Sequence, residues 1–316
     1  MVFFGTPEFA VPTLERLLAG PHDVVAVVSQ PDRPRGRGRR PQASPVSKIA
    51  MGAEIPLLRP ERVAEREFLD DLDTAQPDLG IVAAFGQFLP RAVRDLPRLG
   101  YLINAHASLL PLYRGAAPIA HALLDGKTET GVSIMRIVRE MDAGPVALVG
   151  RMPIRPQDNT ERLSEALAGL AADLVEEAVG LITTGTLEWR EQDHENATLA
   201  PRLSSEDAQL DWRDTAERLA RRVRAMAPRP GAATLVEGEP LRILEAEVHA
   251  GATGGTRPGV VLRGAPPDPL LRIATGDGWL VPQRVQRAGG RVLGIDAFLR
   301  GREIPEGTRL GPPPGD

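Results

Sequence analysis

Two polar side chains near the middle of the chain have the types and the spacing that can stabilise a developing oxyanion. Asn104 and His106 lie two residues apart at the end of a short apolar run. Side chains at that spacing in an extended strand point to the same face. An amide N–H and an imidazolium N–H that converge on one point stabilise negative charge on a carbonyl oxygen. The alternative is that Asn104 and His106 are a structural pair with satisfied hydrogen bonds, and an isolated Asn-x-His sequence more often has that role.

A carboxylate that can work with this pair is Asp142, which Ala-Gly-Pro follows directly. Asp, Gly and Pro after a strand commonly form a turn, and that is the structural interpretation. In the functional interpretation Asp142 projects from this loop toward His106, where it orients the imidazole or takes part in proton transfer. The residue types alone favour the turn and leave both interpretations open.

A basic segment at residues 33–40 is the third candidate. Its five arginines are separated by Gly and Pro, which predict an irregular loop. The structural interpretation is a solvated, flexible loop. The functional interpretation is a loop that follows a phosphate backbone and becomes ordered on nucleic acid. The high charge density within an otherwise acidic half of the chain favours the second interpretation.

The elements that must position these residues form an alternating pattern in the first part of the chain. Short apolar runs predict strands at residues 2–4, 24–28, 78–84, 101–104 and 131–138, with helix-like segments between several of them. This alternation predicts an α/β fold with a mostly parallel sheet. Ligands of such sheets bind at the carboxyl ends of the strands. Residues 159–184 form the clearest helix, because leucines recur every three or four positions.

The pattern changes in the last third of the 316-residue chain. Residues 186–206 are polar and aperiodic, and we predict a linker there. Short strands separated by Gly, Pro and Asp then follow a short basic helix, which predicts a small OB-like β-barrel. The expected domains are therefore 1–185, the linker 186–206, and 207–316.

Composition excludes several classes of protein. The chain has no cysteine, so disulfides and thiolate metal sites are excluded, and its five histidines are scattered. No apolar run reaches the length of a membrane span, about 18 residues, and the first residues do not resemble a signal peptide. Residues 207–316 hold 16 Arg against 14 Asp and Glu, whereas the rest of the chain is net negative. We expect a cytoplasmic protein that binds neither a membrane nor a metal.

Seven strings along the chain resemble the methionyl-tRNA formyltransferase family, within the formyltetrahydrofolate-dependent transferases. They are FFGTPEFAVPTLE, SQPDRPRGRGRR, VAAFGQFLP, INAHASLLPLYRGAAPI, TGVSIMRIVREMDAGPV, LSSEDAQLDW and IATGDGW. They occur in the family's order and extend over most of residues 1–285. The Asn-x-His motif and the later Asp-x-Gly are shared by the wider superfamily, and the arginine-rich segment narrows the resemblance to the tRNA enzymes.

The resemblance implies a Rossmann-like formyltransferase fold followed by an OB-like tRNA-binding domain. It implies 10-formyltetrahydrofolate as the formyl donor and the α-amino group of methionine on initiator Met-tRNA as the acceptor, giving formylmethionyl-tRNA for translation initiation. No metal is required, and a monomer is expected.

The resemblance also assigns residues to roles. The catalytic residues would be Asn104, His106 and Asp142. The residues around the folate would be Ser108, Leu109, Leu110, Pro111, Phe85, Gly86, Gln87, Phe88, Leu89, Val138 and Met141. The residues that contact tRNA would be Arg33, Arg35, Arg37, Arg39 and Arg40.

Two other functions use parts of the same pattern. The first is formyl transfer to a different acceptor, such as a nucleotide-linked amino sugar, which needs the same three catalytic residues but has no evident use for the arginine-rich segment. The second is an RNA-binding protein without enzymatic activity, which explains the charge distribution but leaves Asn104, His106 and Asp142 without a role.

Overall fold

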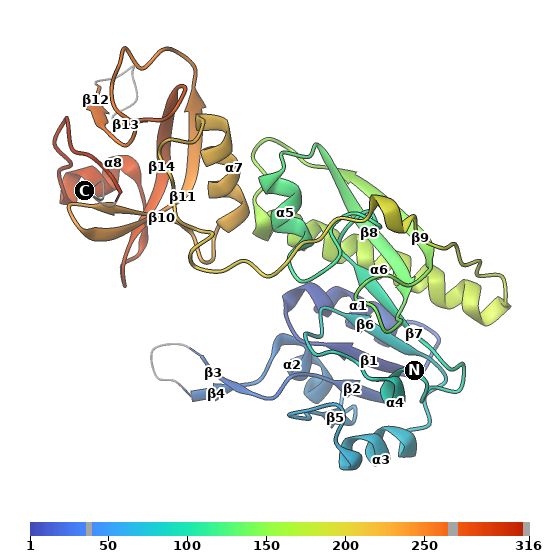
Figure 1. Cartoon of the computed structure of the whole chain (residues 1–316). Coiled ribbons are helices and arrows are strands. Elements are labelled where there is room, and N and C mark those ends of the chain that lie inside the picture. Colours follow the sequence, from blue (N-terminus) through green and yellow to red (C-terminus); the bar gives the residue numbers. More distant parts are fainter. Residues whose placement is uncertain (36–39, 265–270, 312–316) are drawn as a thin grey trace. The chain divides into compact units, whose positions relative to one another are not determined.

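The structure is a computed structural model that describes residues 1–35, 40–264 and 271–311 (Figure 1). The chain divides into two compact units. The first consists of Met1–Pro118, Glu129–Ile154 and Ser164–Pro201, and the second of Ile119–Thr128, Arg155–Leu163 and Arg202–Asp316. These units differ from the expected domains, because two short segments of the first 185 residues group with the second unit. No helix of the described residues has the length and apolarity needed to cross a membrane.

The first unit is built on a seven-stranded sheet with the strand order β5-β2-β1-β6-β7-β8-β9. Its strands are β1 (Val2–Gly5), β2 (Ala26–Val28), β5 (Leu57–Leu58), β6 (Gly80–Ala83), β7 (Leu102–His106), β8 (Glu129–Arg136) and β9 (Val146–Pro153). The first five run parallel, and β8 and β9 are antiparallel additions at one edge. The prediction of a mostly parallel α/β sheet is therefore confirmed.

Helices and 3-10 turns lie between these strands and after the last of them. They are α1 (Val11–Ala19), α2 (Pro45–Gly52), α3 (Arg66–Thr74), α4 (Arg91–Arg94), α5 (Pro118–Leu124) and α6 (Thr160–Thr184), with 3-10 turns η1 (Glu8–Ala10) and η2 (His194–Asn196). Helix α2 has a capped start, because the Ser44 hydroxyl accepts the Ser47 N–H at 2.9 Å and Pro45 occupies the first turn. Helix α6 buries Leu163, Leu167 and Leu174 on one face, in agreement with the predicted spacing.

The arginine-rich segment departs from the sequence prediction, because its flanks form regular structure. Strands β3 (Arg33–Arg35) and β4 (Arg40–Gln42) pair as an antiparallel hairpin in which Pro34 is the register partner of Pro41. Two prolines can be paired where neither strand needs an N–H donor, and a two-stranded ribbon leaves such positions free. The prediction of an irregular loop over residues 33–35 and 40 was therefore wrong.

The second unit contains a six-stranded antiparallel sheet that curls into a half-barrel, with the order β10-β11-β14-β13-β12 and β15 paired to β14. The strands are β10 (Ala232–Val236), β11 (Glu239–His249), β12 (Val261–Arg263), β13 (Leu271–Ala274), β14 (Trp279–Arg287) and β15 (Val292–Gly294). Helices α7 (Ala216–Met226) and α8 (Ile295–Gly301) complete it. Short strands that follow a basic helix are therefore present, as the sequence predicts.

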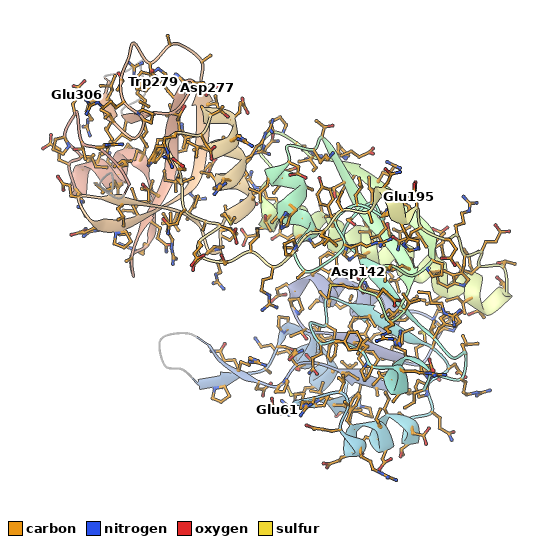
Figure 2. The ribbon with its side chains drawn as sticks, in the orientation of Figure 1. Glu61, Asp142, Glu195, Asp277, Trp279 and Glu306 are labelled. Carbon is orange, nitrogen blue, oxygen red and sulfur yellow. The ribbon has the colours of Figure 1, made fainter. Side chains whose placement is uncertain are left out.

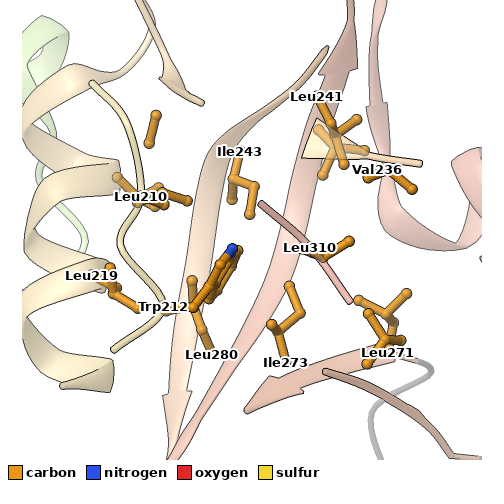
Figure 3. Close-up of a cluster of buried hydrophobic side chains, with 14 of the residues drawn as sticks. Leu210, Trp212, Leu219, Val236, Leu241, Ile243, Leu271, Ile273, Leu280 and Leu310 are labelled. Carbon is orange, nitrogen blue, oxygen red and sulfur yellow. The ribbon is translucent and has the colours of Figure 1, made fainter. Parts of the chain in front are cut away.

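Figure 3 shows the core of this unit, in which Trp212 lies among Leu219, Ile243 and Leu280. The indole N–H donates to the Thr234 hydroxyl at 3.1 Å, so the one polar atom of this buried ring is satisfied. The second unit therefore has a hydrophobic core of its own.

Candidate functional site

Strand β7 presents Asn104 and His106 at the carboxyl end of the parallel strands. Its register pairs Asn104 with Val82 of β6 on one side and with Met135 of β8 on the other. His106 is buried and Asn104 is half-buried. Since both residues belong to one strand, their side chains share a face, as their spacing predicts.

The orientation of the His106 ring follows from its partners. Its Nε2 atom lies 2.9 Å from the backbone oxygen of Tyr113, which can only accept a hydrogen bond. Nε2 therefore carries a hydrogen and donates it. The other ring nitrogen, Nδ1, lies 3.6 Å from Oδ2 of Asp142, which is longer than a direct hydrogen bond. The imidazole thus offers one nitrogen, Nδ1, to a carboxylate and to any group that enters beside it.

Asp142 reaches this position from the loop between β8 and β9, and Figure 2 labels it in the first unit. Its backbone has a φ of 50°, in the left-handed region. Its Oδ2 atom accepts the Gly115 N–H at 2.8 Å, which fixes the carboxylate beside His106. Two residues later, Gly144 packs so closely that a Cβ atom would collide with the Arg136 carbonyl oxygen. The loop is therefore held from both sides of Asp142.

The motif Ser108–Pro111 forms the turn that follows β7. The Ser108 hydroxyl donates to the Leu112 carbonyl at 2.6 Å, and the Ser133 hydroxyl of β8 donates to the Ser108 carbonyl at 2.8 Å. Leu109, Leu110 and Pro111 are half-buried. Ser108 is thus a structural anchor of the turn, and the three apolar residues retain partly accessible surface.

The loop at residues 85–89 follows β6, the parallel neighbour of β7, so it lies at the same end of the sheet as His106. Phe85 is buried against Phe4, and its carbonyl accepts the Thr6 hydroxyl at 3.1 Å. The Gln87 amide is held by the Val63 N–H and the Pro60 carbonyl. Phe88 is 64% exposed, whereas Leu89 is buried.

The remaining predicted residues are distributed over two other regions. Val138 is half-buried and Met141 is 68% exposed on the loop that carries Asp142. Arg33 is exposed, and Arg35 and Arg40 belong to the strands of the β3–β4 hairpin. Arg37 and Arg39 lie outside the described residues.

A segment that the sequence analysis assigned to a linker lies against the site. Residues 190–200, here called the crossing segment, pair with the start of β9 through Arg190 and Val146 and with the loop after β7 through Leu199 and Arg114. The Thr198 hydroxyl also accepts the Tyr113 N–H at 2.8 Å. Polar, aperiodic sequence gave no signal for this placement, because these contacts are mostly made by the backbone.

The donor set of the site suits hydrogen bonding and charge rather than metal ligation. Within the described ranges, no three His, Asp or Glu side chains gather closely enough to hold a metal ion. An amide and an imidazole can donate hydrogen bonds to a reacting carbonyl oxygen, and a carboxylate can accept a proton.

Comparison with known proteins agrees with these features. Residues 1–179 match the family described as formyl transferase, and residues 202–303 match the formyl transferase C-terminal domain. The chain is 44% identical to a methionyl-tRNA formyltransferase of Roseiflexus castenholzii over 98% of both chains. It is 43% identical to that of Thiobacillus denitrificans, over 98% of this chain and 99% of the relative.

Among solved structures, the fold resembles an N-formyltransferase from Helicobacter canadensis in complex with folinic acid and dTDP-3-aminofucose. The TM-score is 0.66 at 17% identity, over 89% of this chain and 97% of that one. With both domains matched and relatives above 40% identity along almost the whole length, the chain belongs to the methionyl-tRNA formyltransferase family.

Proposed function

We propose that this chain transfers the formyl group of 10-formyltetrahydrofolate to the α-amino group of methionine on initiator Met-tRNA, giving formylmethionyl-tRNA for translation initiation. The observation that carries this proposal is the 44% identity to a methionyl-tRNA formyltransferase over 98% of both chains. The meeting of His106 and Asp142, separated by 3.6 Å next to Asn104 on β7, supports it from the geometry.

In the proposed reaction the neutral methionyl amine attacks the formyl carbon. A C–N bond forms to the amine, the C–N bond to N10 of the folate breaks, and a proton passes from the amine to N10. The formyl oxygen gains negative charge in the tetrahedral intermediate, and the Asn104 amide and the His106 Nδ1–H stabilise it. Asp142 lies beside the imidazole and serves the proton transfer.

The folate would lie over the loops at the carboxyl ends of β6 and β7. Phe88 and Met141 are large apolar side chains that are 64% and 68% exposed, on separate loops. Exposed apolar side chains beside a polar centre are typical of a site for a flat heterocycle. The folate is a substrate in this proposal and leaves after it has given up the formyl group.

The tRNA would contact the β3–β4 hairpin and the second unit. Arginines on a two-stranded ribbon neutralise phosphates without reading sequence. We further propose a monomer that acts in the cytoplasm, and sedimentation equilibrium of the purified chain would test the oligomeric state.

The test of the catalytic assignment is a formyl-transfer assay with Asn104→Ala, His106→Ala and Asp142→Ala. Each variant is expected to slow transfer by about 10²–10⁴, the range for an oxyanion donor or an acid–base group. His22→Ala, in the loop after α1, is the matched control and keeps full activity. Near-full activity of the Asn104 or His106 variant contradicts the assignment.

The test of the acceptor uses one labelled formyl donor with three acceptors. They are charged initiator tRNA, charged elongator tRNA and a nucleotide-linked amino sugar. The proposal requires transfer to initiator Met-tRNA, and transfer to the sugar alone overturns it.

A further inference from the structure

Gln192 is a buried polar residue of the crossing segment whose side chain uses all of its hydrogen-bonding capacity. It is 8% exposed. Its oxygen accepts two N–H groups of Arg114, from Nε at 3.1 Å and from Nη2 at 2.7 Å. Its amide nitrogen donates to the Asp142 carbonyl at 2.9 Å and to the Gly144 carbonyl at 2.6 Å.

The partners fix the orientation of this amide. The two backbone carbonyls can only accept and the guanidinium can only donate, so the amide cannot flip without losing all four bonds. A side chain that joins these partners needs both an acceptor and a double donor. Glutamate keeps the acceptor but lacks the donors, and methionine keeps the length but lacks both.

Gln192 joins the loop after β7, which contacts His106, to the loop between β8 and β9, which carries Asp142. Arg114 lies between Tyr113, whose carbonyl binds Nε2 of His106, and Gly115, whose N–H binds Oδ2 of Asp142. On the other side, Gln192 binds the backbone of Asp142 itself. The separation between His106 and Asp142 therefore depends on a side chain that touches neither the imidazole nor the carboxylate.

We propose that Gln192 is a positioning residue that sets the geometry between His106 and Asp142 for formyl transfer. This inference rests on the proposed function for the roles of these two residues. It gives the crossing segment a part in the reaction beyond connecting the two units.

The test compares Gln192→Glu and Gln192→Met with the native chain in the formyl-transfer assay. Gln192→Glu leaves the bonds to Arg114 in place and turns carboxylate oxygen toward two carbonyls, which displaces the Asp142 loop. A displacement of about 1 Å is expected to lower kcat roughly 10- to 100-fold, while the KM values for Met-tRNA and folate change by less than about threefold. Gln76→Glu, the same substitution at an exposed residue of the first unit in the turn after α3, is the control and keeps the native kcat.

A double-mutant cycle separates positioning from general stability. If Gln192 acts through Asp142, then Gln192→Met in an Asp142→Ala background is no slower than Asp142→Ala alone. Native kcat in a folded Gln192→Glu variant overturns the inference, and so do fully additive losses in the cycle. If instead Asp142→Ala alone keeps native activity, the catalytic assignment of the proposed function has failed, which is a distinguishable result.

Discussion

The backbone of Asp142 occupies a conformation that most side chains avoid. Its φ of 50° lies in the left-handed region, which costs a non-glycine residue roughly 1 kcal/mol, although aspartate tolerates it better than most. The bonds from Gly115 and Gln192 to this residue offset that cost. A residue held in such a conformation by its surroundings keeps its carboxylate in place before any substrate binds.

Gly144→Ala tests how closely this loop is packed. The new Cβ would collide with the Arg136 carbonyl oxygen, so we expect a loss of about 1–3 kcal/mol in the free energy of unfolding, together with slower formyl transfer. Urea denaturation and the transfer assay measure the two effects. Gly169→Ala, on the exposed face of α6 with nothing within 4 Å of the new Cβ, is the control and stabilises the chain by about 0.5–1 kcal/mol. Native stability and native activity of Gly144→Ala would contradict the packing argument.

Asp211 provides a prediction of pH dependence. The hydrogen bond from the Arg213 side chain is the main cause that lowers the pKa of Asp211 from 3.8 to about 2. A carboxyl whose pKa is lower in the folded state stabilises that state above the unfolded pKa, and this contribution disappears as the pH falls from about 4 through about 2. Arg213→Ala is expected to raise the pKa of Asp211 toward 3.8 in an NMR titration of the side-chain carboxyl. An unchanged titration would show that the arginine is not the cause.

The orientation of some individual side chains in the site could be predicted from the sequence. The shared face of Asn104 and His106 follows from the two-residue period of a strand. The partners of His106 and Asp142, by contrast, are a backbone carbonyl and a backbone N–H, and residue types do not encode where those groups lie. Gln192 escaped prediction for the same reason, because two of its partners are carbonyls of a distant loop.

The hairpin of β3 and β4 is the element that arranges part of the arginine-rich segment as a two-stranded ribbon. Asp32 lies directly before β3, and its carboxylate accepts a hydrogen bond from Arg59 at 2.8 Å, which stabilises the start of the hairpin. Arginines on such a ribbon act as a unit when they meet a phosphate backbone. Binding through them releases counterions, so affinity depends on salt.

Replacing Arg33, Arg35 and Arg40 together by glutamine tests this element. We expect weaker tRNA binding and a smaller slope of log affinity against log salt, by about 0.9 for each phosphate of a duplex stem that the hairpin no longer neutralises. Filter binding at several salt concentrations measures the slope, and calorimetry with 5-formyltetrahydrofolate provides the control, which remains unchanged. An unchanged slope would show that the hairpin does not contact the phosphates of the tRNA.

The buried central strands of the sheet were the elements that sequence predicted best. Strands β1, β2 and β6 are buried along their whole length, so each appears as a continuous apolar run. Strand β9 was missed, because it lies at the sheet edge with alternating exposure and contains Gly150, which sits against Leu170 and Leu174 of α6. The flanking strands of the arginine-rich segment were missed because Pro and Gly normally indicate a loop.

At the scale of the whole molecule, the two units have separate hydrophobic cores. The change of pattern near residue 207 predicted a second domain. It could not predict that Ile119–Thr128 and Arg155–Leu163 group with that second unit, since this depends on contacts between residues far apart in the sequence.

Leu280→Ala tests the independence of the second core. Leu280 is fully buried beside Trp212, so we expect a loss of about 2–5 kcal/mol in the stability of this unit. Tryptophan fluorescence during urea denaturation reports the loss, while the affinity for 5-formyltetrahydrofolate before the transition stays native, because the proposed folate residues belong to the first unit. Leu293→Ala, at an exposed leucine of β15, is the control and changes stability by less than about 0.5 kcal/mol. Weaker folate binding by Leu280→Ala would contradict the independence of the units.

The hydrogen bond between Nε2 of His106 and the Tyr113 carbonyl prevents proton transfer through the imidazole ring. A proton cannot enter at one nitrogen and leave at the other, because Nε2 faces an oxygen that has no proton to give and no means to pass one on. In the proposed reaction, a hydrogen that leaves Nδ1 of His106 can therefore be replaced only on that same side of the ring, where Asp142 lies. The proton that moves from the methionyl amine to N10 of the folate in the proposed reaction therefore does not pass through the imidazole ring.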